Sequence, residues 1–122
     1  MREINTSILV VGGGLSGLLT AFALSNCGNE IVLIDKNKLF SKSSSTQDYR
    51  TTAISEGSKV FLEKIKIWKK IESFAEPIKN IKVHDRKNIN EINFKNENNS
   101  NFLGYIVRNY ILKNIIINKL KK

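Results

Sequence analysis

Four glycines interrupt an apolar run near the start of this sequence. Residues 8–17 read ILVVGGGLSG, and Gly12, Gly14 and Gly17 match the pattern G-x-G-x-x-G. In this pattern the first glycine permits a tight turn, the second lets a pyrophosphate approach the backbone, and the third lets a helix pack closely on a strand. The residue types and their spacing therefore predict a site for the phosphates of a nucleotide; a tight turn with no ligand is the alternative.

A carboxylate follows at the distance that a dinucleotide requires. Asp35 ends the apolar stretch EIVLID, about twenty residues beyond the glycines, where a carboxylate accepts hydrogen bonds from the ribose hydroxyls of an adenosine. Free hydroxyls favour FAD or NAD over a cofactor with a 2′-phosphate. The N–H groups and the dipole at the start of the next helix attract the phosphates. The cofactor-binding residues predicted in this part of the chain are Gly12, Gly13, Gly14, Leu15, Ser16, Gly17, Asp35 and Lys36.

These residues need a strand, a helix and a second strand to position them. Residues 4–11 and 30–35 read as strands, and the later half of the first is a continuous apolar run, which is typical of parallel strands covered on both faces. Between them, residues 15–27 carry apolar side chains at helical spacings, and Gly28 can end that helix as a left-handed cap. A strand, a helix and a strand within about thirty residues form a βαβ unit. The sequence therefore predicts a Rossmann-like α/β fold.

The rest of the chain reads as alternating helices and strands. Ser55 is the predicted N-cap of its helix, Trp68, Ile71 and Phe74 are predicted to point inward, and Cys27 is predicted to pack in the core. The predicted elements are a polar loop over 36–53, helices over 54–65 and 67–76, a hairpin of strands over 77–85 and 89–95, a strand over 103–108 and a helix over 109–120.

Charge and composition favour an ordinary globular domain. The 122 residues carry a net charge of +9, and all the excess lies after Glu56. A basic module that binds nucleic acid or a membrane surface is one alternative, but we find no nucleic-acid motif. His84 has no partner cluster and is predicted to be a surface histidine. No residue is assigned a catalytic or metal-binding role.

A longer pattern separates FAD from NAD. The segment DYRTTAISEGSKVFLEKIKIWKKIESFAEPIKNIKVHD, followed by LGYIVRN, resembles the flavin-dependent aromatic hydroxylases of ubiquinone biosynthesis, the family of the 2-octaprenyl-phenol hydroxylases. The matching positions are Asp48, Arg50, Ala53, Ile54, Ser55, Gly57, Ser58, Leu62, Trp68, Pro77, Ile78, Ile81, Val83, Asp85, Gly104, Tyr105 and Val107.

The resemblance implies functions that composition and spacing do not. It implies FAD as the cofactor, NAD(P)H as co-substrate of the full-length family and a polyprenyl-phenol as substrate. It adds Arg50 and Asn109 to the predicted cofactor-binding residues, Arg50 as an arginine that approaches FAD and Asn109 as a polar residue near the flavin. It also implies an N-terminal portion of a two-dinucleotide-type flavoprotein with the start of a β-rich substrate domain.

The organisation expected from this resemblance is one truncated FAD-binding domain over residues 1–122. Its parts are the dinucleotide fingerprint over 1–36, a flavin-site loop and helices over 37–76, strands of the substrate-domain type over 77–100, and a return strand and helix over 101–122. Such a chain is expected to be inactive alone. We expect it to work with a separately encoded C-terminal remainder or other ubiquinone-pathway proteins, in the cytoplasm or at a membrane surface. A fragment of a halogenase or an isoprenoid reductase is the alternative within flavoproteins.

Overall fold

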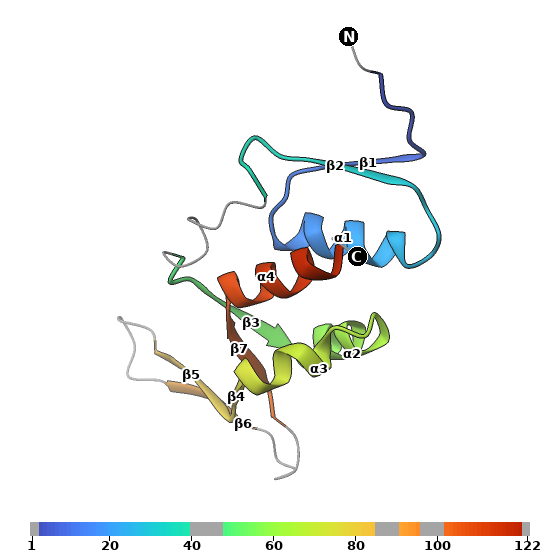
Figure 1. Cartoon of the computed structure of the whole chain (residues 1–122). Helices are drawn as coiled ribbons and strands as arrows, with labels where there is room; N and C mark the ends of the chain where they lie inside the picture. Colours follow the sequence, from blue (N-terminus) through green and yellow to red (C-terminus); the bar gives the residue numbers. More distant parts are fainter. Residues whose placement is uncertain (1–2, 40–47, 85–90, 96–101, 121–122) are drawn as a thin grey trace.

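The computed structural model describes residues 3–39, 48–84, 91–95 and 102–120 (Figure 1). Helices and strands alternate along the described chain in the order β1-α1-β2-β3-α2-α3-η1-β4-β5-β6-β7-α4. The described chain contains a pair of parallel strands connected by a helix, and further helices alternate with strands. This confirms the predicted α/β class. The predicted division into parts stays a prediction.

The N-terminal βαβ unit forms as the apolar pattern predicts. Strand β1 (Ile8–Val11) pairs in parallel with β2 (Ile31–Ile34), and α1 (Leu15–Ser25) connects them. Gly28 has φ +81°, a left-handed conformation that favours glycine, just after the end of α1. The strands therefore bring both the glycine-rich turn and Asp35 to their carboxyl ends.

A second sheet contains three strands. In it β7 (Gly104–Arg108) lies between β3 (Thr51–Ser55) and β4 (Glu76–Ile78), and both pairings are antiparallel. Helix α2 (Glu56–Lys64) leaves β3 directly, and the Ser55 hydroxyl accepts a hydrogen bond from the Ser58 N–H at 3.2 Å. This confirms Ser55 as an N-cap.

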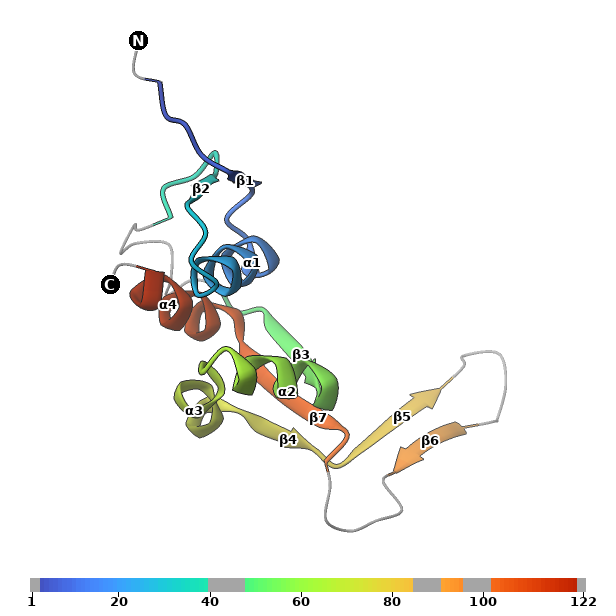
Figure 2. The same cartoon turned by 90° about the vertical axis from the view of Figure 1, so that its right-hand side faces the viewer.

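The core joins the two sheets through α4 (Asn109–Leu120), which packs beside α1 (Figure 2). Trp68, at the start of α3 (Trp68–Ile71), meets the Tyr105 ring edge-on with centroids 4.9 Å apart. Buried apolar side chains from the four α-helices and from β3 and β7, with Ile67 just before α3, form one cluster: Leu18, Phe22, Ile54, Leu62, Ile67, Trp68, Ile71, Val107, Leu112, Ile116 and Ile117. The cluster holds the start of α1 near β3 and α4.

The predicted hairpin is confirmed and projects from the body of the molecule (Figure 2). Strands β5 (Asn80–His84) and β6 (Glu91–Lys95) pair antiparallel. One face carries exposed apolar side chains, in the cross-strand pairs Ile81–Phe94 and Val83–Ile92. The turn predicted between the strands lies outside the described residues.

Four predictions about these elements were wrong. Residues 51–53 were expected in a loop but form β3, because their partner β7 lies over fifty residues away in the sequence. Phe74 is 55% exposed, because α3 gives way to the 3-10 helix η1 (Glu72–Phe74), which changes the direction of its side chain. Cys27 is exposed in the turn after α1 rather than packed. The single strand expected over 77–85 is two strands, β4 and β5, with different partners.

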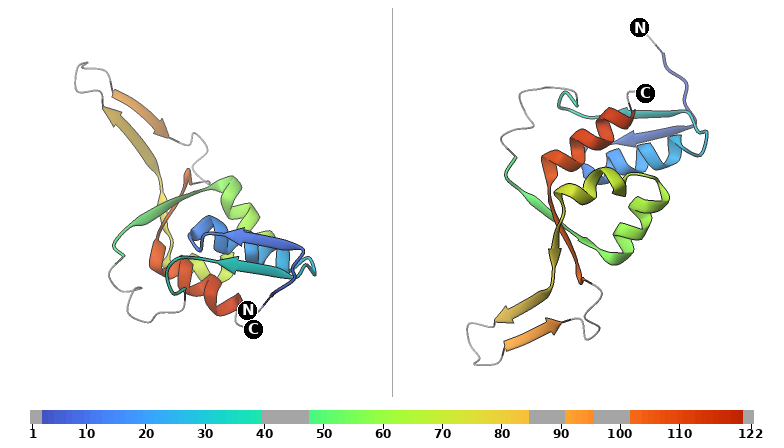
Figure 3. Two further views of the ribbon diagram at one scale, coloured as in Figure 1. Left: turned by 90° about the horizontal axis from the view of Figure 1, so that it is seen from above. Right: turned by 60° about the horizontal axis from the view of Figure 1, so that its bottom comes forward.

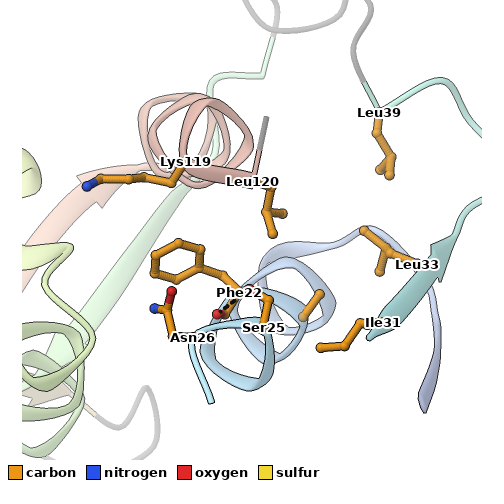
Figure 4. Close-up of a pocket in the computed structure, with 9 residues that line it drawn as sticks. Phe22, Ser25, Asn26, Ile31, Leu33, Leu39, Lys119 and Leu120 are labelled. Atoms are coloured by element: carbon orange, nitrogen blue, oxygen red, sulfur yellow. Dashed lines mark hydrogen bonds between the residues drawn. The ribbon is translucent and has the colours of Figure 1, made fainter. Parts of the chain in front are cut away.

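The parallel sheet has an uncovered side. Figure 3 shows β1 and β2 uppermost when the molecule is seen from above, with α1 beneath them. Leu9, Val11 and Ile34 are 55%, 75% and 46% exposed. A groove of about 460 Å³ also opens between α1, β2 and the end of α4, next to Leu33, Leu39 and Leu120 (Figure 4). Parallel strands are normally covered on both faces, so this sheet exposes an unusual amount of apolar surface.

Candidate cofactor site

The glycine-rich turn connects β1 to α1 through a backbone conformation that favours glycine. Gly12 has φ +104°, which disfavours any side chain, and its N–H donates to the Ile34 carbonyl at 2.7 Å. Gly14 is the N-cap of α1 with extended φ and ψ of −69° and 179°. The N–H of Leu18 donates to the Gly14 carbonyl at 2.9 Å and closes the first helical turn.

The three glycines of the pattern have different surroundings. A Cβ on Gly17 would overlap the carbonyl oxygen of Gly12, so Gly17 permits the close contact of α1 with the turn. A Cβ on Gly14 would meet no atom of the described residues within 4 Å. The fold therefore requires glycine at positions 12 and 17. At Gly14 the described residues leave a free space that a ligand could occupy.

The start of α1 can bind an anion in that space. The N–H groups of Leu15, Ser16 and Gly17 precede the first helical bond and point out of the helix start. The first turn of α1 holds no acidic side chain, so no residue of the helix itself competes for these N–H groups. A phosphate at this point would receive both hydrogen bonds and a favourable field.

Asp35 is tied to the glycine turn, a contact that the sequence analysis did not foresee. Its Oδ2 accepts a hydrogen bond from the Gly13 N–H at 2.6 Å, and its Oδ1 accepts one from the Asn37 N–H at 2.7 Å. These bonds, from Asn37 first and Gly13 second, lower the pKa of Asp35 below its ordinary value of 3.8, with a smaller effect from Lys36. Asp35 is therefore ionised at neutral pH, and its oxygens keep further lone pairs for ribose hydroxyls.

Asp35→Asn is expected to make the stability of the chain less sensitive to acid. Since the folded pKa of Asp35 is lowered, its contribution is full above the unfolded value near 3.8 and is lost as the pH falls through the folded pKa. Melting temperatures of both proteins between pH 2 and 6 should show a smaller loss in the variant below about pH 4. Parallel curves for the two proteins would contradict this assignment.

A second polar group lies where β3 and β7 reach α4. Asn109, the first residue of α4, donates its N–H to the Arg50 carbonyl at 2.9 Å. The Thr52 hydroxyl donates to Asn109 Oδ1 at 2.6 Å. The structure thus brings Arg50 and Asn109 together and adds Thr52. Thr52 was not among the predicted site residues, because the polar sequence around it predicts a loop.

The Arg50 side chain turns to its neighbour Asp48. Its Nε and Nη2 donate to the two carboxylate oxygens of Asp48 at 2.8 and 2.9 Å. This pair lowers the pKa of Asp48 to about 2 and leaves the Arg50 side chain 75% exposed. A bidentate partner holds the guanidinium in a fixed position, and its remaining N–H donors stay accessible.

One cavity is bordered both by the start of α1 and by β3, the strand that carries Thr52. It has a volume of about 210 Å³ and is bordered by Leu15 and Ser16 from the start of α1 and by Thr52 and Ala53 from β3. Apolar side chains from α2, α3 and α4 complete its wall. The start of α1, which follows the glycine-rich turn, and Thr52 therefore border the same cavity.

The described residues hold neither a metal cluster nor a histidine in the site. Among them no group of three or more His, Cys, Asp or Glu side chains could hold a metal ion. His84 is exposed, with its Nε2 at 3.7 Å from Glu91 on the hairpin. None of the helices in the described ranges has the length and apolar character to cross a membrane.

Comparison with protein families gives a match along most of the chain. The family described as FAD binding domain matches residues 5–110, from before β1 to the start of α4. The chain belongs to this family. FAD is accordingly the cofactor, and the predicted FAD-type α/β fold is confirmed.

The curated relatives of this FAD-binding domain include enzymes of ubiquinone biosynthesis. The chain is 29% identical over 113 residues to ubiquinone hydroxylase UbiL of Rhodospirillum rubrum, covering 93% of the chain and 26% of the relative. It is 25% identical over 131 residues to the mitochondrial ubiquinone biosynthesis monooxygenase COQ6 of Dictyostelium discoideum, covering 94% and 26%. The chain therefore spans about a quarter of the length of these relatives.

Solved structures share the fold of this FAD-binding domain. The p-nitrophenol 4-monooxygenase PnpA from Pseudomonas putida DLL-E4 superposes with a TM-score of 0.72 at 21% identity, covering 99% of the chain and 30% of that protein. A geranylgeranyl bacteriochlorophyll reductase-like protein from Thermoplasma acidophilum gives 0.64 at 23% identity, covering 95% and 28%. At these identities the likeness concerns the arrangement of the backbone.

The geometry of the site fits the adenosine diphosphate half of FAD. The free space at Gly14 and the N–H groups at the start of α1 suit a pyrophosphate, and the ionised Asp35 beside them suits ribose hydroxyls. The assignment of individual residues to atoms of FAD remains a prediction for all ten predicted positions.

Proposed function

We propose that this chain is the FAD-binding portion of a flavin-dependent monooxygenase that hydroxylates a polyprenyl-phenol ring in ubiquinone biosynthesis. The observation that carries the proposal is the open space at Gly14, in a chain whose relatives are named ubiquinone hydroxylases and a ubiquinone biosynthesis monooxygenase. Bound FAD would supply the redox chemistry, with NAD(P)H and O₂ as co-substrates. The residues of this chain would hold and orient the cofactor.

Each part of the site has a separate task in this proposal. The Leu15, Ser16 and Gly17 N–H groups bind the pyrophosphate, and Asp35 binds the adenosine ribose. Arg50 approaches the cofactor with donors that its Asp48 pair leaves free, and Asn109 offers its side chain at the start of α4. No residue of this chain is assigned a role in proton transfer.

The test is a titration of the purified chain against FAD, followed by the change in flavin fluorescence. We expect saturable binding of one FAD per chain, with AMP and ADP as competitors, because the site holds the adenosine diphosphate half. The proposal fails if fluorescence does not saturate and if neither AMP nor ADP competes.

Arg50→Ala is expected to weaken FAD binding about tenfold while leaving the melting temperature nearly unchanged. The side chain is exposed, so its loss disturbs little packing, whereas a charged hydrogen bond to a phosphate is among the stronger ones. Asp48→Asn is the matched variant, since it frees the guanidinium without removing it. Equal FAD affinity of Arg50→Ala and the unmodified chain would exclude Arg50 from the site.

The proposal includes a partner polypeptide that corresponds to the rest of the relatives' length. The exposed apolar residues of the parallel sheet and the groove beside β2 support this, because such surfaces are covered in stable proteins (Figure 4). Other ubiquinone-pathway proteins and a peripheral contact with a membrane are part of the same proposal. The proposed location is the cytoplasm or its membrane surface.

The isolated chain is expected to self-associate through this uncovered sheet. Size-exclusion chromatography with light scattering should give masses well above 13.8 kDa, and Leu9→Lys should shift the distribution toward monomer. Thr20→Lys, on an exposed position of α1, is the control and should leave the distribution unchanged. A monodisperse, cooperatively melting monomer would contradict the expectation.

A further inference from the structure

Thr52 contacts Asn109 across 57 positions of the sequence. Thr52 lies on the face of β3 that also carries the buried Ile54, and not on the face of the exposed Thr51 and Ala53. Its side chain therefore points toward the interior and the 210 Å³ cavity rather than to solvent. A polar side chain in that direction needs a partner, and Asn109 provides it.

In the structure the Asn109 amide turns its oxygen toward β3 and its Nδ2 away from it. The Thr52 hydroxyl donates to Oδ1 at 2.6 Å, so the amide oxygen is engaged on the β3 side. The Asn109 N–H is engaged as well, with the Arg50 carbonyl at 2.9 Å. The Nδ2 group, which has two N–H donors, has no hydrogen-bond acceptor among the residues that the structure describes.

The position of this free donor suits a bound cofactor. Asn109 begins a helix of twelve residues, so its amide lies at the positive end of α4. Through Thr52 it adjoins the cavity that Leu15 and Ser16 border at the start of α1. A donor at this place would meet an acceptor atom of a molecule that is bound along the same cavity.

We infer that Thr52 is a positioning residue that orients the Asn109 side chain so that Nδ2 donates a hydrogen bond to an acceptor atom of bound FAD. The inference rests on the proposed function and names the residue that sets the direction of the amide. Without the hydroxyl, the amide can turn over and present Oδ1, which repels the acceptor. Thr52 itself does not contact the cofactor in this account.

The test compares Thr52→Val, which has nearly the same shape but no hydroxyl, with Thr52→Ser, which keeps the hydroxyl. We expect Thr52→Val to weaken FAD binding about three- to tenfold, the range of one neutral hydrogen bond, and Thr52→Ser to bind within about twofold of the unmodified chain. In the Asn109→Ala background Thr52→Val should have no further effect, because the group that it positions is absent.

A second readout follows the amide itself without any cofactor. In ¹H–¹⁵N spectra the Asn109 side-chain NH₂ resonances should move in Thr52→Val and stay in place in Thr52→Ser. If the unmodified chain binds FAD and Thr52→Val binds equally well, the inference is wrong and the proposed function stands. The inference is also wrong if Thr52→Val weakens FAD binding in the Asn109→Ala background by as much as it does in the unmodified chain. If the unmodified chain binds no FAD, the proposed function fails and the inference falls with it.

Discussion

Gly14→Val is expected to remove most FAD binding while the chain keeps its fold. The glycine has extended φ and ψ, which valine adopts readily, and a Cβ there meets no atom within 4 Å in the part of the chain that the structure describes. The loss of glycine at an N-cap costs less than about 1 kcal/mol. A side chain in the space of a closely fitted phosphate costs about 1–3 kcal/mol, which lowers FAD affinity about 10- to 100-fold.

Two measurements check this expectation together. Fluorescence titration should show the loss of affinity, and thermal unfolding should show a melting temperature within about 5 °C of the unmodified chain. Gly14→Ser is the matched variant, since serine is a good N-cap that still fills the space. Both variants should fold and bind FAD weakly. Unchanged affinity in Gly14→Val would mean that the pyrophosphate does not lie at this residue.

Gly17→Ala is expected to unfold the chain or destabilise it severely. The added methyl group would overlap the carbonyl oxygen of Gly12, a backbone atom that cannot rotate away, and would also approach Val10. Alanine improves helix propensity by about 1 kcal/mol over glycine, whereas overpacking against a fixed neighbour costs about 3 kcal/mol or more. The steric effect therefore prevails, and FAD binding is lost because the fold is lost.

The control for this prediction is another glycine within a helix. Gly57 lies in α2, and a Cβ there meets only the Ser55 hydroxyl at 4.0 Å. Gly57→Ala should therefore stabilise the chain by about 0.5–1 kcal/mol. Urea unfolding of both variants measures the difference. If Gly17→Ala proved as stable as Gly57→Ala, α1 would not need the close contact with the glycine turn.

The nature of the site could be predicted because its signals are local. Gly12, Gly14, Gly17 and Asp35 lie within one βαβ unit, where a strand, a turn and a helix follow each other directly along the chain. The N-cap at Ser55 was predicted for the same reason, since its partner is only three positions away. Short-range hydrogen bonds and steric needs are visible in the order of residue types.

Contacts between distant parts of the sequence could not be predicted in this way. The strand character of residues 51–53 depends on β7, and the pairing of Thr52 with Asn109 depends on the position of α4. The bond from Gly13 to Asp35 depends on the register of β1 and β2. Each requires that non-neighbouring elements meet in a particular register, which a single sequence does not display.

The residue order alone was thus sufficient for the glycine turn, the carboxylate after the second strand and the α/β fold, because each follows from local backbone geometry and apolar periodicity. The choice of FAD over NAD came from the resemblance of the later residues to a flavoprotein family. Tertiary packing decided the rest. It gave Gly14 an open space and Gly17 a crowded one, although both are glycines of one pattern. It also engaged Asn109 Oδ1 with Thr52, since only the folded chain brings β3 to the start of α4.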